Sequence, residues 1–337
     1  EEAPAPNLSE KTRKALWAAA VALAKAVNYS NAGTCEFLVD SKENFYFLEM
    51  NTRLQVEHPV TELVWGIDLP VLQLQVASGE QLPSMLHSLT PRGHAIEARL
   101  YAEDPSKNFM PSPGVLEEFQ MATLPGLRID AVYETASEVP IYYDAMLAKV
   151  IAWGMSREQA RVTLSEGLRK SNVVGVAWNG PYLVDILAHK TFCEGNVDTQ
   201  FLGREFAQWK GETRSALKEE KNQTQSSASA FASPWVVYGE GTGKVGSAKR
   251  ARSNSGDFDV RSLAVDGPLI SEYPGKVLKV AVKSGQRVVK GQVVVVCESM
   301  KMEFSYAAQR DATVKTVGVK ETQVITAGTL LVDWESA

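Results

Sequence analysis

An internal repeat near the end of the chain restricts its fold more than any other feature of the sequence. Residues 275–299 align with residues 312–336 at a constant offset of 37, with matching apolar positions. Short valine-rich runs between glycines are typical of strands joined by tight turns, so each copy is expected to form four short strands and no helix. About 70 residues are near the lower limit for one hydrophobic core. Two interlocked copies, related by a pseudo-two-fold axis, would form a compact flattened barrel.

The tripeptide Met300-Lys301-Met302 lies between the two copies. A hairpin there would present the lysine beyond the rim of the barrel, and the unbranched, polarisable methionines could shape a recognition surface. The segment resembles the attachment motif of the biotinyl-carrier family, which implies biotin linked covalently to Lys301 by a biotin protein ligase. Two alternatives are an ordinary exposed lysine on a turn and a lipoyl domain, which usually has Asp-Lys in this place.

Two strand-like runs, residues 34–40 and 45–51, are expected to form a hairpin. In its expected register Glu36 lies opposite Glu49, with about 5 Å between their Cβ atoms. Two carboxylates this close repel each other unless a cation or a proton joins them. Asn51 on the same face adds a third oxygen ligand, and Mg²⁺ prefers oxygen ligands together with substrate phosphates. The hairpin therefore predicts a site for Mg²⁺ or Mn²⁺ with a nucleotide, the alternative being a solvated surface pair.

The same register makes further predictions along the hairpin. It pairs Asp40 with Phe45 and Leu38 with Phe47, and it places Leu38 beside the base of the nucleotide. Phe37, Phe45 and Phe47 flank the acidic pair and suggest that it is buried.

Residues 1 to about 205 resemble the C-terminal part of biotin carboxylase, an ATP-grasp enzyme. The motifs that carry the resemblance are residues 32–38, 47–62, 94–105 and 142–150. They are long and nearly contiguous, so chance similarity is negligible. The resemblance implies a ligase that uses ATP and bicarbonate to carboxylate biotin.

The resemblance also assigns roles to individual residues. It implies that Arg53, Gln55 and the backbone of Val56 bind bicarbonate, and that Glu57 is the general base that deprotonates it for attack on ATP. Arg99 would stabilise the negative charge that develops on the ureido oxygen of biotin. Structural salt bridges are the alternative for both arginines. The role of His58 stays open, because its side chain could orient Glu57 or simply pack against its neighbours.

The sequence lacks part of what an ATP-grasp ligase needs. No glycine-rich phosphate loop precedes Ser9, and the lysines that hold the phosphates are missing from the sequence. We therefore expect the C-terminal portion of a longer protein, with half of an ATP site and no ligase activity of its own.

Helical periodicity is present over residues 9–29, 61–79, 157–169 and 181–189, the second of these interrupted near Pro70. Proline disrupts a helix interior because it lacks the amide donor and its ring clashes with the preceding turn. Helices mixed with hairpins predict an α+β fold.

Four regions are expected. Residues 1–90 would be the C-terminal part of the ATP-grasp domain, 91–205 the biotin carboxylase C-terminal subdomain, 206–266 a linker and 267–337 the biotin carboxyl carrier domain. The linker is polar and low in large apolar residues, so we expect it to be largely flexible. A small docking domain around residues 234–238 is the alternative.

Composition narrows the partners and the compartment. The net charge of −5 argues against a nucleic-acid partner, and no apolar run approaches the roughly 20 residues of a membrane span. The three cysteines have no zinc-site or disulfide spacing, which favours a reducing compartment. We expect the cytoplasm for a bacterial protein, or the mitochondrial matrix for a eukaryotic one.

The layout of the chain indicates the type of carboxylase. The segment between residues 205 and 267 is too short for a carboxyltransferase domain. The resemblance is therefore strongest to the alpha subunits of acyl-CoA carboxylases (propionyl-CoA, 3-methylcrotonyl-CoA or acetyl-CoA). Such a subunit would form a hetero-oligomer with a separate carboxyltransferase beta subunit, and the acyl-CoA acceptor stays open. Two other classes are alternatives: a biotin carrier with a vestigial upstream segment, and an ATP-grasp ligase for another substrate, such as a purine-pathway carboxylase.

Overall fold

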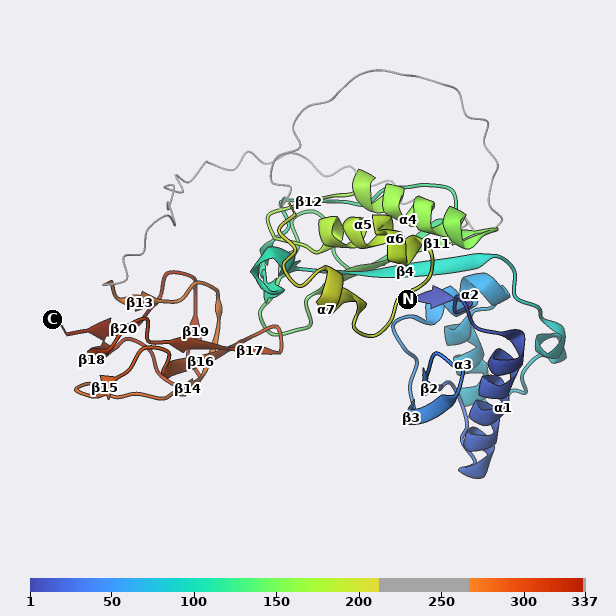
Figure 1. The fold of residues 1–337 in the computed structure, drawn as a ribbon, viewed down its shortest axis with the longest axis horizontal. Helices are drawn as coiled ribbons and strands as arrows, with labels where there is room; N and C mark the ends of the chain where they lie inside the picture. Colours follow the sequence, from blue (N-terminus) through green and yellow to red (C-terminus); the bar gives the residue numbers. More distant parts are fainter. Residues whose placement is uncertain (212–266, 336–337) are drawn as a thin grey trace, which may run out of the picture. The chain divides into compact units, whose positions relative to one another are not determined.

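The computed structural model describes residues 1–211 and 267–335 of the chain. The chain divides into two compact units, residues 1–216 and 217–337, whose elements are labelled in Figure 1. Most of the expected linker, and with it the docking domain considered around residues 234–238, lies outside the described residues. Within the described part, no helix is both long and apolar enough to cross a membrane.

An antiparallel sheet of four strands forms the centre of the first unit. Its strand order is β1-β4-β11-β9, and β4 and β11 are long strands with many apolar residues. Alternate side chains of β4 point to opposite faces of the sheet, so Leu100 and Arg99 face opposite sides. The strands are β1 (Glu2–Ala3), β4 (His94–Tyr101), β9 (Leu127–Ala131) and β11 (Met146–Gly154).

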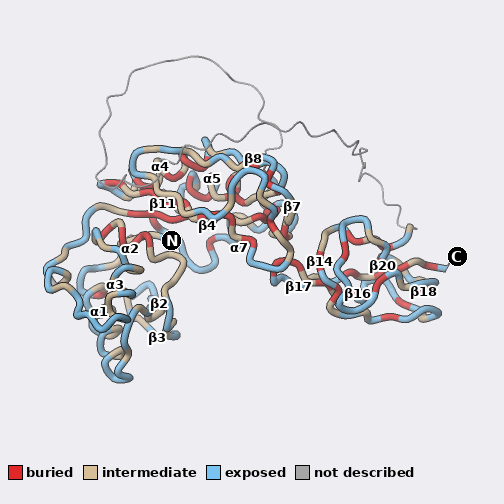
Figure 2. The backbone as a smooth tube through the Cα atoms, turned by 180° about the vertical axis from the view of Figure 1, so that it is seen from behind, coloured by how far each residue is buried: buried red, intermediate tan, exposed pale blue. Residues whose placement is uncertain are grey.

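Helices cover both faces of this sheet (Figures 1 and 2). On one face lie α4 (Arg157–Lys170) and α5 (Gly180–Ala188). On the other face lies α2 (His58–Trp65), whose Val60 and Val64 pack against the sheet. Figure 2 shows that the buried residues of the unit follow this layered region.

Shorter elements complete the first unit. Its paired strands are β2 (Thr34–Val39) with β3 (Phe45–Asn51), β5 (Glu103–Asp104) with β6 (Met110–Pro111), β7 (Gly114–Val115) with β10 (Glu138–Val139), and β8 (Glu118–Gln120) with β12 (Asn172–Val174). Its other helices are α1 (Glu10–Ala26), α3 (Leu69–Ala77), α6 (Lys190–Cys193), α7 (Phe201–Glu205) and the 3₁₀ helices η1 (Ser84–Ser88) and η2 (Pro105–Lys107).

The helix expected over residues 61–79 is two helices, α2 and α3. Gly66 ends α2 in the left-handed conformation, with φ of +68°. Asp68 then starts α3, because its side chain accepts a hydrogen bond from the amide of Val71 at 2.8 Å. Pro70 lies in the first turn of α3, where its missing amide hydrogen is not needed.

The β2–β3 hairpin places Glu36 opposite Glu49, but part of the expected register is wrong. Phe37 pairs with Phe47, so one additional residue, Leu48, is accommodated as a bulge before Glu49. Leu38 consequently lies opposite Tyr46 instead of Phe47. The acidic pair is not buried as expected, because Glu49 is exposed and the flanking Phe47 is itself 46% exposed.

Asp40 does not pair with Phe45 as expected, since Val39 takes that position. Its side chain closes the turn by accepting hydrogen bonds from the amides of Lys42 and Asn44, at 2.8 and 2.9 Å. Side-chain hydrogen bonds of this kind are what make aspartate a good turn residue. The turn is therefore one residue longer than the sequence pattern indicated, because β2 ends at Val39 while β3 begins at Phe45 as expected.

The first unit extends past residue 205, where the sequence placed the start of the linker. Phe206 and Trp209 pack edge-on against Tyr182 of α5, with ring centroids 5.6 and 5.3 Å away. The indole of Trp209 donates a hydrogen bond to Asp185 at 2.8 Å. Two aromatic anchors within a polar stretch are enough to hold the chain against α5 as far as residue 209.

The second unit contains two four-stranded sheets, with orders β13-β20-β18-β15 and β17-β16-β14-β19. The offset of 37 relates β14 to β18, β15 to β19 and β16 to β20, so each sheet contains strands from both copies. This arrangement confirms the interlocked barrel predicted from the repeat. The strands are β13 (Leu269–Ile270), β14 (Gly275–Val280), β15 (Arg287–Val288), β16 (Val293–Ser299), β17 (Met302–Ala307), β18 (Ala312–Val317), β19 (Val324–Ile325) and β20 (Leu330–Trp334).

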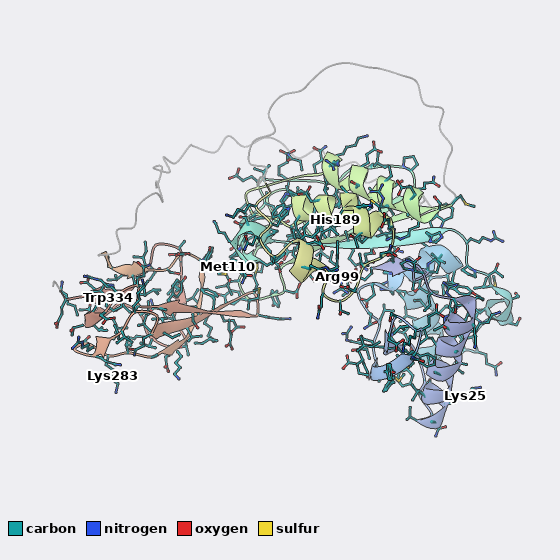
Figure 3. The ribbon with its side chains drawn as sticks, viewed as in Figure 1. Lys25, Arg99, Met110, His189, Lys283 and Trp334 are labelled. Carbon is teal, nitrogen blue, oxygen red and sulfur yellow. The ribbon has the colours of Figure 1, made fainter. Side chains whose placement is uncertain are left out.

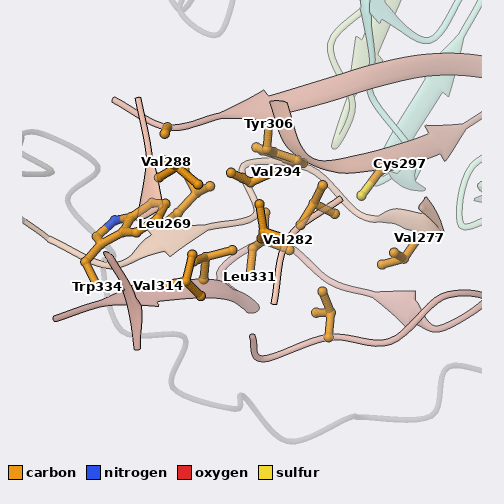
Figure 4. Packing of buried hydrophobic residues seen from close by; sticks show 14 of the residues in the cluster. Leu269, Val277, Val282, Val288, Val294, Cys297, Tyr306, Val314, Leu331 and Trp334 are labelled. Carbon is orange, nitrogen blue, oxygen red and sulfur yellow. The ribbon is translucent and has the colours of Figure 1, made fainter. Parts of the chain in front are cut away.

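The barrel core is built from repeat-related pairs of side chains (Figure 4). Val277 and Val314 are both fully buried, and Val294 and Leu331 form a second such pair. Cys297 of the first copy occupies the place that Trp334 takes in the second. The two sheets bury their inner faces against each other, which allows a domain of this size to have one continuous core.

The turns repeat as closely as the strands, with one informative difference. Gln286 donates to the carbonyl of Lys283 at 3.1 Å, and Gln323 donates to Lys320 at 3.2 Å. In the first turn Gly285 has φ of +81°, whereas the equivalent residue of the second turn is Thr322, with φ of +68°. A β-branched residue is strained in this conformation.

We predict that Thr322→Gly stabilises the second unit. Relief of about 1–2 kcal/mol of left-handed strain is partly offset by the greater unfolded-state freedom of glycine, about 0.5–1 kcal/mol. Native-state amide exchange in β18 and β20 should therefore slow by a few-fold. Gly285→Thr is the matched control and should accelerate exchange in the same strands. Equal exchange rates in wild type and Thr322→Gly would contradict the prediction.

Candidate functional site

The hairpin of the first unit brings two carboxylates together with two amides. The amide nitrogen of Asn51 donates to Glu36 at 2.7 Å and to Glu49 at 3.2 Å. Gln55 also donates to Glu36, at 2.9 Å. Neither acid forms an ion pair within the described residues, so neutral amides are the groups that hold the two negative charges. Leu38, expected beside a nucleotide base, is 48% exposed on β2.

This donor set suits a hard divalent cation. Two carboxylates without a compensating cation favour Mg²⁺ or Mn²⁺. Substrate phosphates and water would complete the oxygen shell of the ion. The Asn51 side chain can supply its oxygen by a rotation of the amide, which has the same shape in both orientations. In the described residues no group of three His, Cys, Asp or Glu side chains is placed to hold a metal, so a cation here would depend on the amide and on substrate oxygens.

The segment between β3 and α2 carries the residues expected to bind bicarbonate. Arg53 is exposed and forms no ion pair within the described residues; its guanidinium donates to the carbonyl of Leu54 at 3.3 Å. A free guanidinium is available to an incoming anion. Gln55 contacts Glu36 with its side chain and His58 with its carbonyl oxygen, so it connects the acidic pair to the start of α2.

Glu57 and Arg99 form an ion pair, although they are distant in the sequence. Arg99 lies on β4, on the face of the sheet away from α4 and α5 (Figure 3), and its Nη2 is 2.9 Å from a carboxylate oxygen of Glu57. The same nitrogen is 2.7 Å from Glu1. Both Glu57 and Arg99 remain about 30% exposed, so the pair is accessible from solvent. The carboxylate expected to act as general base and the guanidinium expected to stabilise developing negative charge are thus adjacent.

Asn179 fixes the backbone of β4 beside Arg99. Its side chain donates to the carbonyl of Arg99 at 3.1 Å and accepts from the amide of Tyr101 at 2.9 Å. β1 pairs with Ala95 and Ile96 of β4, so these two backbone groups lie beyond the end of β1 along the same edge of the strand. The buried Asn179 therefore satisfies both groups beside the guanidinium that is expected to act in the site.

His58 does not contact Glu57. Its Nδ1 is 2.7 Å from the carbonyl oxygen of Gln55, and its Nε2 is 3.8 Å from Glu62. Because a carbonyl can only accept, Nδ1 carries the hydrogen. His58 therefore supports the backbone of the segment before α2, which is the packed role considered as the alternative.

Lys149 and Glu97 are candidates that the motifs did not single out. Lys149 on β11 donates to the carbonyl of Val56 at 3.1 Å and pairs with Asp130 at 3.3 Å. Glu97 on β4 is 3% exposed, and its carboxylate has no hydrogen-bond partner within the described residues. Burial raises its pKa from the ordinary 4.5 to about 7. The signal in the sequence was a charged residue within an apolar strand: Lys149 is the one charged residue of β11, whereas Glu97 shares β4 with Arg99.

In the second unit Lys301 lies at the tip of the hairpin between β16 and β17. Ser299 pairs with Met302, which leaves a two-residue loop of Met300 and Lys301. Both have positive φ, 50° and 65°, as a tight hairpin turn of this length requires. Asparagine and glycine are the usual residues there, so this loop holds two longer side chains in a strained conformation. Lys301 is exposed, as an attachment site must be.

Three family models match the chain. The model for the ATP-binding domain of the carbamoyl-phosphate synthase L chain matches residues 1–85, that for the biotin carboxylase C-terminal domain matches 97–204, and that for biotin-requiring enzymes matches 265–333. Fold and matches together define the C-terminal part of an ATP-grasp biotin carboxylase, joined to a biotinyl-type barrel. The chain belongs to the biotin-dependent carboxylases, as the motifs predicted.

The curated relatives include alpha subunits of acyl-CoA carboxylases. The methylcrotonoyl-CoA carboxylase alpha subunit of Arabidopsis thaliana is 48% identical over 204 residues, which are 60% of this chain and 28% of the relative. The propionyl-CoA carboxylase alpha chain of Homo sapiens is 33% identical over 430 residues, covering 99% of this chain and 59% of the relative. The chain therefore spans about a quarter to three fifths of the length of these relatives.

Solved structures of biotin carboxylases match 60% of the chain. The biotin carboxylase domain of Hydrogenobacter thermophilus 2-oxoglutarate carboxylase, in complex with MgADP, ADP and bicarbonate, is 37% identical with a TM-score of 0.59 over 45% of its length. The biotin carboxylase–beta-gamma-ATP complex from Campylobacter jejuni is 41% identical with a TM-score of 0.58, also over 45% of its length.

We predict that Glu97 makes the stability of the first unit depend on pH. An acid whose pKa is higher in the folded than in the unfolded chain stabilises the fold fully below about 4.5, and this contribution is lost as pH rises through about 7. Glu97→Gln, which mimics the protonated acid, should match wild type near pH 5. It should be more stable by roughly 1–3 kcal/mol near pH 8.

Thermal unfolding of both proteins across this pH range measures the effect. The exposed Glu134 supplies a matched control, since Glu134→Gln should leave the pH profile unchanged. A Glu97→Gln profile parallel to wild type from pH 5 to pH 8 would exclude a perturbed carboxyl at this position.

Proposed function

We propose that this chain is the C-terminal portion of the alpha subunit of a biotin-dependent acyl-CoA carboxylase. Its reaction is the ATP- and bicarbonate-dependent carboxylation of biotin carried on Lys301. The observation that carries the proposal is the presence, in one chain, of the Glu57–Arg99 pair next to a bicarbonate-type segment and of an exposed lysine at the tip of a two-fold barrel. A biotin carrier without carboxylase activity would not need the Glu57–Arg99 pair. An ATP-grasp ligase for another substrate would not need the exposed lysine.

In this proposal the hairpin holds the metal and the nucleotide phosphates. Glu36, Glu49 and Asn51 would hold Mg²⁺ or Mn²⁺, which would neutralise negative charge on the phosphates of ATP. Leu38 would contact the base. The exposed apolar surface of β2 and β3 supports this role, since a nucleotide can cover such surface only where it is open to solvent.

The segment before α2 would bind and activate bicarbonate. Arg53 supplies a guanidinium that forms no ion pair within the described residues, and Gln55 and the amide of Val56 supply neutral donors. Glu57 removes the bicarbonate proton, so that the bicarbonate oxygen can attack the γ-phosphate of ATP, displace ADP and form carboxyphosphate. Arg99 both orients the Glu57 carboxylate and provides positive charge where a ureido oxygen becomes negative.

The second unit would deliver the acceptor. Biotin, when attached, supplies a ureido nitrogen that takes up and later releases the carboxyl group. Acylation of Lys301 by a biotin protein ligase removes the charge of the side chain and places the ring at the end of a long tether. The tight turn holds the tether beyond the barrel surface, where a second active site can reach it.

We further propose a separate carboxyltransferase beta subunit, in a hetero-oligomer, as the site that receives the carboxyl group. Support comes from the acyl-CoA carboxylase alpha subunits among the relatives. Those relatives are mitochondrial proteins, whereas biotin carboxylase 2 of Bacillus subtilis is a bacterial one. The mitochondrial matrix or the bacterial cytoplasm is the corresponding location.

The domain bounds proposed from the sequence are residues 267–337 for the carrier domain and 91–205 for the biotin carboxylase C-terminal subdomain.

We expect Lys301 to be the single biotinylated residue. Intact-mass analysis after co-expression with a biotin protein ligase should show one added biotin in wild type and none in Lys301→Arg, because arginine cannot form the amide. The exposed Lys283 is the control, since Lys283→Arg should still gain the full mass. Biotin remaining on Lys301→Arg would place the attachment site elsewhere.

We expect Glu57→Gln, in the intact carboxylase, to reduce bicarbonate-dependent ATP cleavage by about 10²- to 10⁴-fold, the usual contribution of a general base. Nucleotide binding, measured by calorimetry, should persist because the acidic pair on the hairpin is untouched. Glu117→Gln, on an exposed position, serves as the control. If Glu57→Gln instead abolished metal–nucleotide binding, Glu57 would be a ligand and not the base.

A further inference from the structure

Lys149 is the central member of a charged row that crosses the sheet. It lies directly opposite Arg99 on β4 and directly opposite Asp130 on β9, so the three side chains share one face. Its side chain is only 13% exposed. Burying a lysine in an otherwise apolar strand is unfavourable unless its donors are satisfied, and one ion pair alone would use only one of three.

A second donor of Lys149 is directed at the segment that carries the base. Its Nζ is 3.1 Å from the carbonyl oxygen of Val56, a residue 93 positions away in the sequence. This carbonyl belongs to the peptide that joins Val56 to Glu57. The ammonium therefore fixes the plane of the peptide bond that precedes the Cα atom of Glu57. Lys149 does so from β11, the strand that pairs with the Arg99 strand β4.

Asp130 in turn has a fixed position. Arg128 contacts both of its carboxylate oxygens, at 2.9 and 3.0 Å, and donates to Glu62 at 2.7 Å. The other oxygen of Glu62, a buried residue of α2, accepts from the amide of Leu69 at 2.8 Å. The chain of contacts thus begins at the carbonyl of Val56 and ends at Glu62 of α2, the helix that begins at His58.

The neighbouring carbonyl, that of Gln55, is held by His58 at 2.7 Å. Two successive carbonyls before α2 are therefore bound by side chains from different elements.

We propose that Lys149 is a positioning residue for the carboxylation of biotin: it holds the Val56–Glu57 peptide so that the base and the amide of Val56 face bicarbonate together. This inference rests on the proposed function. It assigns to Lys149 no contact with a substrate; Lys149 acts through the backbone. Misplacement of a reacting group by about 1 Å reduces rates by on the order of 100-fold, so the expected effect is large.

The test uses the intact carboxylase and measures kcat and KM for bicarbonate and for ATP. Lys149→Met should lower kcat/KM for bicarbonate by about 10- to 100-fold and leave KM for ATP within about two-fold. Lys149→Arg keeps a cation that can donate to both partners and should recover most of the loss. Lys170→Met is the matched control, because Lys170 pairs with Glu166 on the exposed side of α4.

Two outcomes would overturn the proposal. One is a folded Lys149→Met enzyme whose bicarbonate kinetics equal those of wild type; the other is an equal loss in the bicarbonate and ATP parameters. A wild-type enzyme without bicarbonate-dependent ATP cleavage would instead refute the proposed function itself.

A second measurement covers the case in which Lys149→Met does not fold. Asp130→Asn leaves Lys149 in place but weakens its anchor. Amide exchange should then accelerate in the peptide covering residues 53–60 and stay unchanged in α4. Unchanged exchange in residues 53–60 would show that the Asp130–Lys149 contact does not hold this segment, and the proposal would fail.

Discussion

The docking of α2 on the central sheet is the contact on which the first unit depends. Val60 and Val64 pack against Ala95 and Ile151, and the buried Glu62 is bound by Arg128. The apolar contacts supply the driving force, whereas the buried ion pair fixes one register of the helix, because a shifted helix would leave Glu62 unpaired. The segment with Arg53, Gln55, Val56 and Glu57 directly precedes this helix, so the site forms where α2 is held.

The two units solve the problem of presenting reactive groups in different ways. In the first, charged residues stand on the face of a sheet that is otherwise apolar, and hydrogen bonds from distant elements hold them. In the second, the scaffold is a two-fold barrel in which no charged residue among 267–335 is buried, and Lys301 is exposed on a strained two-residue turn. A general base must be held in a fixed position to act on a small anion, whereas a carrier lysine must extend into solvent. The fixed charged residues of the first unit suit the former requirement, and the exposed turn of the second unit suits the latter.

Much of the fold and of the candidate site could be predicted where it depends on a local pattern in the sequence. The 37-residue offset predicted the barrel because a repeated alternation of apolar residues can bury both inner faces in only a few ways. The opposition of Glu36 and Glu49 was also predicted, yet for an incomplete reason. The turn and the Leu48 bulge each differ from the expected register, and the two differences cancel at Glu49. Such bulges have no clear signal in a single sequence.

The sequence by itself determined the two-fold barrel with Lys301 at its tip, the family, and most residues of the site, since these depend on periodicity and on contiguous motifs. Tertiary structure alone decided which distant side chains meet. The Glu57–Arg99 pair, the support of Arg99 by Asn179 and the contact of Lys149 with Val56 join residues that are 42, 80 and 93 positions apart. Their meeting depends on strand register and helix docking, which are set by the packing of the whole core and not by any local pattern.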